Sequence, residues 1–236
     1  MRYKRLCVIN AEKLKKLKNQ FINVINQETR YTSAYTGKST LDKRVMQAMA
    51  DVPRHKFVPS SQISFAYDNM PLTIGSGQTI SQPFIVALMT DFLATEENHI
   101  VLDVGTGSGY QAAILSRLVK KVISVEIVES LAISARQRLR DLGYENVSVN
   151  ASNGFYGCQE YAPYDGIIVA AASPVIPQSL INQLKVGGKM VIPVGNPYNT
   201  QELVLVKKTG TNEYTTRYFL PVAFVPLVGL SKAHDE

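Results

Sequence analysis

Apolar residues between positions 100 and 170 come in short continuous runs, and longer amphipathic segments separate these runs. The runs predict strands at 100–104, 122–125, 147–149 and 164–170, and the intervening segments predict helices at 111–119 and 131–142. The runs do not alternate with polar residues, which is typical of strands covered on both faces. Repeated strand and helix units of this kind predict an α/β fold with a doubly wound, mostly parallel sheet.

The last part of the chain breaks this rhythm. Residues 190–193, 203–207 and 214–219 have the pattern of strands, and only a turn at 209–212 separates the last two. Because so short a connection makes a hairpin, we expect a seven-stranded sheet that ends antiparallel. Residues 184–189 contain two adjacent glycines and predict the end of a helix, with glycine just after the cap.

The N-terminal region is basic and amphipathic. Residues 1–44 carry a charge of +8, which leaves −2 for the remainder because the whole chain carries +6. Apolar residues at helical spacing (Leu14, Leu17, Phe21, Ile22, Val24, Ile25) lie among basic ones (Arg2, Lys4, Arg5, Lys13, Lys15, Lys16, Lys18). We expect a helix that packs on the core and exposes its lysines, rather than one that contacts RNA or a membrane. No basic patch is interleaved with aromatic residues, so no nucleic-acid partner is expected.

Two further helices are predicted before residue 100. One covers 41–50 and would be capped by Ser39 or Thr40, and the other covers 83–93 with proline in its first turn. We therefore expect an N-terminal helical extension with a substrate-side loop (1–82), a core (83–230) and a frayed tail (231–236).

Composition limits the remaining possibilities. The chain has no run of 18 apolar residues and no charged and apolar leader, so we expect a cytoplasmic protein without a membrane partner. Cys7 and Cys158 lack the C-x-x-C spacing and are predicted to be free thiols. No metal site is expected, and we expect a monomer.

Five small residues, Gly105-Thr106-Gly107-Ser108-Gly109, join the strand at 100–104 to the next helix. Closely spaced glycines at such a junction bring backbone N–H groups and the positive end of a helix up to a ligand. The G-x-G-x-G spacing after Asp103 resembles motif I of the class I methyltransferases, which bind S-adenosylmethionine, and differs from the G-x-G-x-x-G of dinucleotide folds. A plain tight turn also favours glycine, so this alternative stays open.

Glu126 ends the next predicted strand and follows Gly105 by 21 positions. An acidic residue at this distance is placed to accept hydrogen bonds from both ribose hydroxyls of an adenosine. The alternative is that Glu126 only begins the following helix, where a negative charge is favoured.

Two hydroxyl side chains, Thr79 and Ser81, lie at alternate positions between Gly77 and Pro83. They are placed to donate hydrogen bonds to an anion at the mouth of a cofactor site. The alternative is that Ser81 merely caps the helix that begins at Pro83.

Four segments together resemble the protein-L-isoaspartate O-methyltransferase family over residues 40–230. They are Val-Pro-Arg-His-Lys-Phe-Val-Pro at 52–59, Gly-Gln-Thr-Ile-Ser-Gln-Pro at 77–83, the glycine motif at 101–110 and Phe-Val-Pro-Leu at 224–227. The resemblance implies an S-adenosylmethionine-dependent enzyme that methylates the free carboxylate of L-isoaspartyl residues in damaged proteins and so initiates their repair. Ser81 matches the active-site serine of that family.

The implied reaction needs no general base, because a carboxylate nucleophile is already ionised at pH 7. We therefore expect Ser81 and Thr79 to orient the acceptor carboxylate, not to attack. The expected cofactor-binding residues are Asp103, Gly105, Thr106, Gly107, Ser108, Gly109, Glu126, Asn153 and Gly154. The chain has Asn153 before Gly154 where relatives usually have an acid, and Phe155 where tryptophan is frequent. Alternatives are a methyltransferase acting on a different carboxylate acceptor and a non-catalytic cofactor-binding module.

Overall fold

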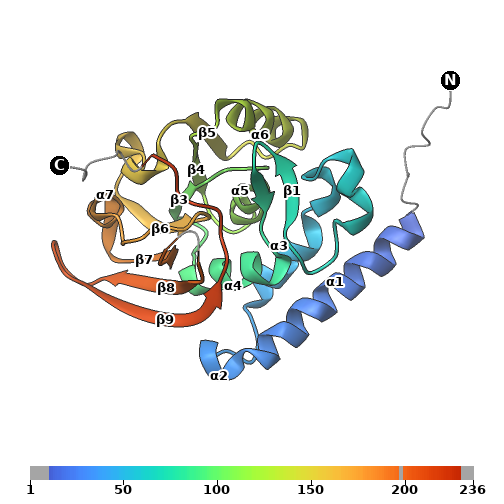
Figure 1. Ribbon diagram of the computed structural model, residues 1–236, viewed down its shortest axis with the longest axis horizontal. Coiled ribbons are helices and arrows are strands. Elements are labelled where there is room, and N and C mark those ends of the chain that lie inside the picture. The colour runs from blue at the N-terminus through green and yellow to red at the C-terminus, as the bar shows by residue number, and fades with distance from the viewer. Residues whose placement is uncertain (1–10, 197–198, 230–236) are drawn as a thin grey trace.

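Seven strands form one sheet in the order β5-β4-β3-β6-β7-β8-β9 (Figure 1). The computed structural model describes residues 11–196 and 199–229. The strands are β3 (Ile100–Val104), β4 (Lys121–Glu126), β5 (Val147–Ala151), β6 (Tyr164–Val169), β7 (Leu184–Val194), β8 (Gln201–Lys208) and β9 (Tyr214–Val222). Strands β3 to β7 run parallel, whereas β8 is antiparallel to both β7 and β9. The predicted doubly wound sheet with an antiparallel C-terminal hairpin is therefore confirmed.

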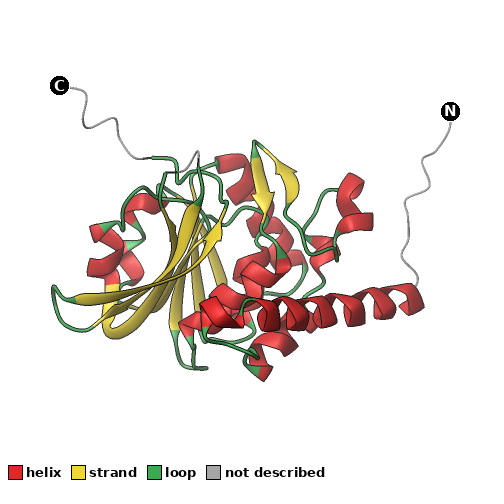
Figure 2. Cartoon of the chain, turned by 60° about the horizontal axis from the view of Figure 1, so that its bottom comes forward, coloured by secondary structure: helices red, strands yellow, loops and turns green. Residues whose placement is uncertain are grey.

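Helices cover both faces of the sheet (Figure 2). Val101 and Val122 face one side and pack with residues of the helices there, while Leu102 and Ile123 face the other side, where α7 packs. This alternation within continuous apolar runs explains why the strands lack a polar face. The helices of the first side are α3 (Lys43–Asp51), α4 (Pro83–Leu93), α5 (Tyr110–Ser116) and α6 (Glu129–Asp141), and α7 covers Gln178–Gln183.

The basic N-terminal segment forms a long helix, α1 (Ala11–Tyr31), that crosses the outside of the first helical layer (Figure 1). It buries Phe21, Ile25 and Thr29, and the Phe21 ring meets that of Tyr67 edge to face at 5.4 Å. Lys13, Lys15 and Lys16 are exposed, and Lys18 Nζ donates to the carbonyl of Ala50 (2.7 Å). The expectation of a helix packed on the core is confirmed. A short helix, α2 (Ser33–Thr36), follows it and lies against β9.

Some expectations concern residues outside the described part of the chain. These are Arg2, Lys4, Arg5 and Cys7 at one end and the tail 231–236 at the other. Cys158, which is described, is a free thiol. None of the described helices has the length and the apolar content needed to cross a membrane.

Two details of the predicted elements are wrong. Asp42, not Ser39 or Thr40, caps α3, since its Oδ1 accepts from the backbone N–H of Arg44 (2.7 Å). Residues 184–189 do not end a helix but begin β7, because α7 already stops at Gln183. The glycines there serve an irregular pairing with β6, in which a Cβ on Gly188 would lie within 3.0 Å of two backbone oxygens.

A two-stranded hairpin, which the sequence pattern did not predict, precedes α4. It consists of β1 (Leu72–Gly75) and β2 (Gln78–Ile80), paired antiparallel. Four 3₁₀ turns complete the described structure: η1 (Arg54–Lys56), η2 (Ser60–Phe65), η3 (Gly154–Tyr156) and η4 (Gln159–Tyr161). The hairpin and η1 are the elements of the N-terminal part that bear on the site.

Candidate active site

The glycine turn lies where the strand order reverses, at the carboxyl end of β3 between β4 and β6. Gly105, Gly107 and Gly109 have φ values of 92°, 52° and 88°, a region that residues with a side chain rarely adopt. The N–H groups of Gly105 and Thr106 both donate to the carbonyl of Val125 in β4 (2.9 and 3.2 Å). The turn is therefore attached to the neighbouring strand and does not project freely. In open α/β sheets this position is the usual ligand site.

Asp103 lies beneath the turn and is fully buried. Its Oδ2 accepts from Ser124 Oγ (2.7 Å), and Ser124 Oγ in turn lies 2.5 Å from Thr106 Oγ1. Asp103 Oδ1 has no hydrogen-bond partner within the described structure. Burial, opposed by the Ser124 hydrogen bond and reinforced by the charge of Glu126, raises the pKa of Asp103 to about 7. Asp103 is thus connected through the hydroxyls of Ser124 and Thr106 to the cavity above the turn, which is lined by Thr106 but not by Asp103.

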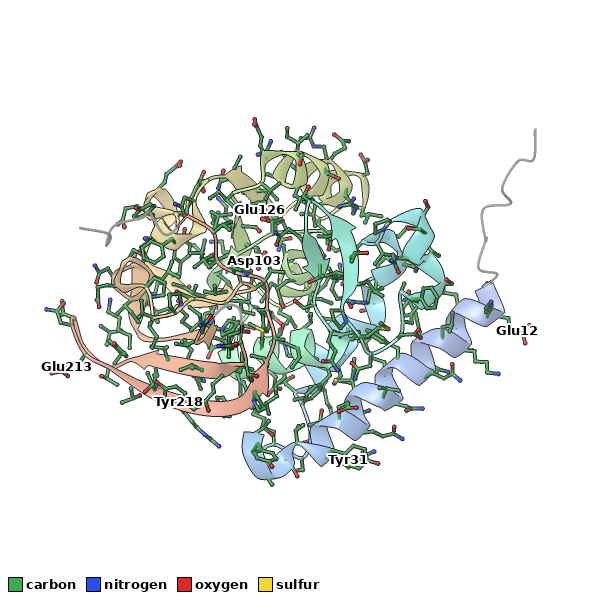
Figure 3. All side chains as sticks on the ribbon, viewed as in Figure 1. Glu12, Tyr31, Asp103, Glu126, Glu213 and Tyr218 are labelled. Carbon is green, nitrogen blue, oxygen red and sulfur yellow. The ribbon has the colours of Figure 1, made fainter. Side chains whose placement is uncertain are left out.

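Glu126 lies at the carboxyl end of β4, near Asp103 in the middle of the molecule (Figure 3). Its Oε2 accepts from the N–H of Gly107 (2.8 Å), and its Oε1 accepts from the N–H of Val128 just before α6 (3.0 Å). The carboxylate therefore supports both the glycine turn and the start of a helix. A carboxylate has about four lone-pair sites, so both oxygens keep acceptor capacity for a ligand.

A cavity of about 830 Å³ opens over the carboxyl ends of β3, β4 and β6. Six of the nine expected cofactor residues line the cavity, namely Gly105, Thr106, Gly107, Ser108, Glu126 and Gly154. A Cβ on Gly154 would lie 2.5 Å from Val104 Cγ1, so the wall has no room for a side chain there.

Asp103, Gly109 and Asn153 are outside the lining of this cavity. A Cβ on Gly109 would approach Leu139 Cδ1 to 3.1 Å, so this glycine lets α5 and α6 pack closely. Asn153 Oδ1 accepts from the N–H of Phe155 (3.0 Å), and its Nδ2 donates to the carbonyl of Gly229 (3.0 Å). An aspartate lacks that donor, so the departure from the family pattern at Asn153 has a local structural reason.

A second cavity of about 960 Å³ adjoins the first. Thr79, Ser81, Ala170 and Val225 line both cavities, and we call these four residues the seam. The described residues around the second cavity carry no charge, and its outer wall comes from residues 221–225. The hydroxyl residues predicted to orient an acceptor thus lie where two cavities meet.

Ser81 does not cap α4. The N-cap position is Gln82, whose side chain makes no capping hydrogen bond, and the N–H of Phe84 donates to Asn69 Oδ1 instead (3.0 Å). The alternative role for Ser81 is therefore wrong. Its carbonyl oxygen accepts from Arg54 Nη2 (2.8 Å).

Neither described histidine lines either cavity. His55 Nδ1 is paired with the hydroxyl of Tyr67 (2.8 Å), and burial lowers the pKa of His55. His99 Nδ1 accepts from the N–H of Glu96 (3.1 Å), and His234 is outside the described range. Among the described residues no group of three His, Cys, Asp or Glu side chains is placed to hold a metal ion.

Several cavity residues were not assigned from the sequence. They are Gln78 and Ile80 of the hairpin, Val86 and Met89 of α4, Tyr110 and Gln111 of α5, Ile127 and Val128 after β4, Ala170 and Ala171 after β6, and 225–228. The segment 224–227 carries part of the family resemblance, which was the only signal for its place near the site.

A reversed strand order with a glycine turn and a carboxylate at the ends of adjacent strands is typical of α/β enzymes that bind an adenosine-containing cofactor, a class that includes the S-adenosylmethionine-dependent methyltransferases. The model of the protein-L-isoaspartate(D-aspartate) O-methyltransferase family matches residues 6–232. The chain belongs to this family. It is thus a transferase that uses S-adenosylmethionine to methylate isoaspartyl residues of damaged proteins for repair.

Individual relatives agree with the family match. A protein-L-isoaspartate O-methyltransferase 2 of Syntrophobacter fumaroxidans is 54% identical over 210 residues, which are 89% of this chain and 85% of the relative. One from Polaromonas is 56% identical, with 85% of this chain and 95% of the relative covered. A solved protein-L-isoaspartate O-methyltransferase matches with a TM-score of 0.79 at 27% identity, over 90% of this chain and 66% of that one.

The buried carboxyl group predicts a pH dependence of stability. Since the pKa of Asp103 is about 7 in the folded protein against 3.8 ordinarily, the folded state holds a proton between pH 4 and 7 that the unfolded chain releases. The free energy of unfolding should therefore fall as pH rises through this window and level off above it, by at most about 4 kcal/mol. Asp103→Asn should lack this component, so its stability relative to wild type should increase from pH 5 to 8.

Urea unfolding of the cofactor-free proteins at pH 5, 6, 7 and 8 measures this difference. Glu97→Gln, which removes an exposed carboxylate, controls for the change in net charge. Parallel pH profiles for wild type and Asp103→Asn would contradict the raised pKa.

Proposed function

We propose that Thr79 and Ser81 hold the free carboxylate of an isoaspartyl residue at the seam between the two cavities. The observation that carries the proposal is that both residues line both cavities. The cavity over the glycine turn would take the cofactor, and the uncharged cavity beside it would take the residues around the acceptor. A substrate carboxylate at the seam then has the methyl donor on one side and its own peptide on the other.

Positioning is the main task of these residues. Bound S-adenosylmethionine supplies a methyl group on a positively charged sulfur, which a carboxylate attacks directly. The acceptor is ionised at pH 7, so the side chains need to fix its orientation and exclude other approaches, and no group needs to remove a proton. Thr79 and Ser81 each offer one hydroxyl donor for this purpose.

We further infer how the cofactor is held. The N–H groups of Gly105, Thr106 and Gly107 are already bonded to Val125 and Glu126, so the turn Gly105 to Gly109 would contribute the close approach of its glycine backbone, and Glu126 would accept from the ribose hydroxyls of the cofactor. Gly154, with Asn153 behind it, would border the adenine end. Asp103 would act through Ser124 and Thr106: when Asp103 is ionised, Ser124 donates to it and Thr106 donates to Ser124, which leaves the Thr106 oxygen free to accept.

The cavity residues fit this cofactor on two grounds. A Cβ would lie 3.3 Å from Ile74 Cδ1 at Gly107 and 2.5 Å from Val104 Cγ1 at Gly154, so close packing keeps both wall positions free of side chains and a ligand can approach their backbone directly. The one charged side chain among the described lining residues is the carboxylate of Glu126. A cavity with a negative group suits a ligand with ribose donors and positive charge.

The enzyme is further proposed to act in the cytoplasm as a monomer, with isoaspartyl proteins as partners and no nucleic acid. The free thiol of Cys158 is compatible with a reducing compartment. Because α1 packs its apolar face on the core, its exposed lysines can serve to keep the outer face solvated, and no nucleic-acid partner is needed to explain them.

Glu126→Gln should weaken binding of S-adenosylhomocysteine. Replacing the carboxylate by an amide removes acceptor capacity toward the ribose, and a hydrogen bond to a charged group contributes roughly 1.5–3 kcal/mol, so affinity should fall about 10- to 100-fold. Isothermal titration calorimetry measures this. Glu129→Gln, three residues further on and exposed, is the matched control. If the two variants bind S-adenosylhomocysteine with equal affinity, the proposal that Glu126 binds the cofactor is contradicted.

Ser81→Ala should bind S-adenosylhomocysteine as wild type does but lose kcat/KM for an isoaspartyl peptide by roughly 10- to 100-fold, because a donor to a charged acceptor is lost. Thr79→Val should behave similarly. Thr73→Val is the control, since Thr73 pairs with Thr79 in the hairpin yet lines neither cavity. Full turnover by Ser81→Ala would refute its role in orienting the carboxylate.

The acceptor is tested with paired peptides that differ only in an isoaspartyl or an aspartyl linkage. With methyl-labelled S-adenosylmethionine, label should enter the isoaspartyl peptide alone. Transfer to a small carboxylic acid but to neither peptide would indicate a different acceptor. Cofactor binding without any transfer would indicate a non-catalytic module.

A further inference from the structure

Arg54 is a completely buried arginine next to the seam. It lies in η1, and its Nη2 donates to the carbonyl oxygen of Ser81 (2.8 Å). The guanidinium lies over the ring of Tyr110, 4.8 Å from the ring centroid. Tyr110 is the first residue of α5 and lines the cofactor cavity. Arg54 thus connects the backbone of the acceptor segment to the wall of the cofactor cavity, although it lines neither cavity itself.

The charge of Arg54 is not balanced by any described neighbour. No carboxylate of the described residues forms an ion pair with it, and its Nε and Nη1 are buried without a hydrogen-bond partner. The phenols around it stay neutral, because burial raises the pKa of Tyr110 to about 12 and raises that of Tyr67 further. Burial lowers the pKa of Arg54, but an arginine keeps its proton in proteins.

An isolated buried charge is costly. Each buried ion loses several kcal/mol of hydration, and apolar residues of similar size often replace buried ions without loss of stability. A role limited to packing therefore does not explain an arginine here. What the acceptor site lacks among its described residues is a positive charge, since the lining of the second cavity is neutral. The group expected at the seam is an anion.

We infer that Arg54 is a positioning residue for methyl transfer, which holds the main chain of Ser81 and supplies a buried positive charge behind the acceptor carboxylate. Its hydrogen bond holds the Ser81 main chain through the carbonyl oxygen, which limits the positions that the side-chain hydroxyl can take at the seam. A charge in a site shielded from water is screened little by salt. The inference rests on the proposed role of Ser81.

The test compares Arg54→Met with Arg54→Lys. Arg54→Met keeps much of the volume but removes the charge and the hydrogen bond, so the KM for an isoaspartyl peptide should rise roughly 10- to 100-fold, as for loss of a charged interaction. This rise should be the same at low and high salt. Arg54→Lys keeps the charge and should recover most of the lost affinity for the peptide. The dissociation constant of S-adenosylhomocysteine should stay within about twofold of wild type in both variants.

Lys208→Met provides the matched control. Lys208 is another buried cation, but its Nζ donates to the carbonyls of Ile181 and Leu184 at the end of α7, away from both cavities. Its loss should lower stability in urea and leave the KM of the folded enzyme unchanged. Urea unfolding of all three variants shows whether a change in KM arises because part of the protein is unfolded.

Three results would overturn the inference. One is an unchanged KM in a folded Arg54→Met variant. Another is a parallel loss of S-adenosylhomocysteine affinity, which would place the charge behind the cofactor instead. The third is a KM in Arg54→Lys as high as in Arg54→Met. Full turnover by Ser81→Ala would contradict the proposed function of the seam. If Ser81→Ala loses turnover but Arg54→Met keeps it, the proposed function of the seam is retained and only the inference about Arg54 is contradicted.

Discussion

The hydrogen bonds that tie the glycine turn to β4 determine where the rest of the site lies. Val125 accepts from two N–H groups of the turn and Glu126 from a third, so the chain reversal after β3 is fixed against the end of the neighbouring strand. On the other side, the N–H of Ala170 donates to the carbonyl of Val104 (2.8 Å) and holds the end of β6 in place. The cofactor cavity is the space that these three strand ends leave above them.

The side of the site that is proposed to hold the acceptor is built from elements that belong to the sheet only indirectly. The hairpin β1–β2 brings Thr79 and Ser81 to the cavity, and Ile74 of the same hairpin faces Gly107 of the turn. The opposite wall comes from residues after β9, where the N–H of Ala172 donates to Val225 and that of Leu227 donates to Ala172 (both 2.8 Å). The ends of the strands therefore form one side of the site, which we propose holds the methyl donor, and two connecting segments attached to them form the side that we propose holds the acceptor.

These differences explain what the sequence predicts well. Buried parallel strands appear as continuous apolar runs, and the glycine turn shows itself through residues that tolerate positive φ. The hairpin β1–β2 escaped prediction because its strands have only four and three residues, several of them exposed. Residues 184–189 were misassigned because adjacent glycines suit an irregular strand pairing as well as a helix end. Arg54 lies in the segment 52–59 that carries part of the family resemblance, but no role was predicted for it, since neither burial nor a missing counter-charge can be read from a single residue type.

The distribution of charge in the site follows the chemistry of the reaction. The proposed cofactor side contains two carboxyl groups, Asp103 and Glu126, one buried beneath the turn and one on the cavity wall. The proposed acceptor side has neutral walls among the described residues, with the buried cation Arg54 behind the seam. A positively charged methyl donor would lie near the carboxyl groups and a negatively charged acceptor near Arg54, so each reactant would lie beside protein groups of opposite charge. Because methyl transfer neutralises both charges, such a field stabilises the bound reactants more than the transition state, so it would act through substrate binding, and the alignment of the two reactants would have to lower the barrier.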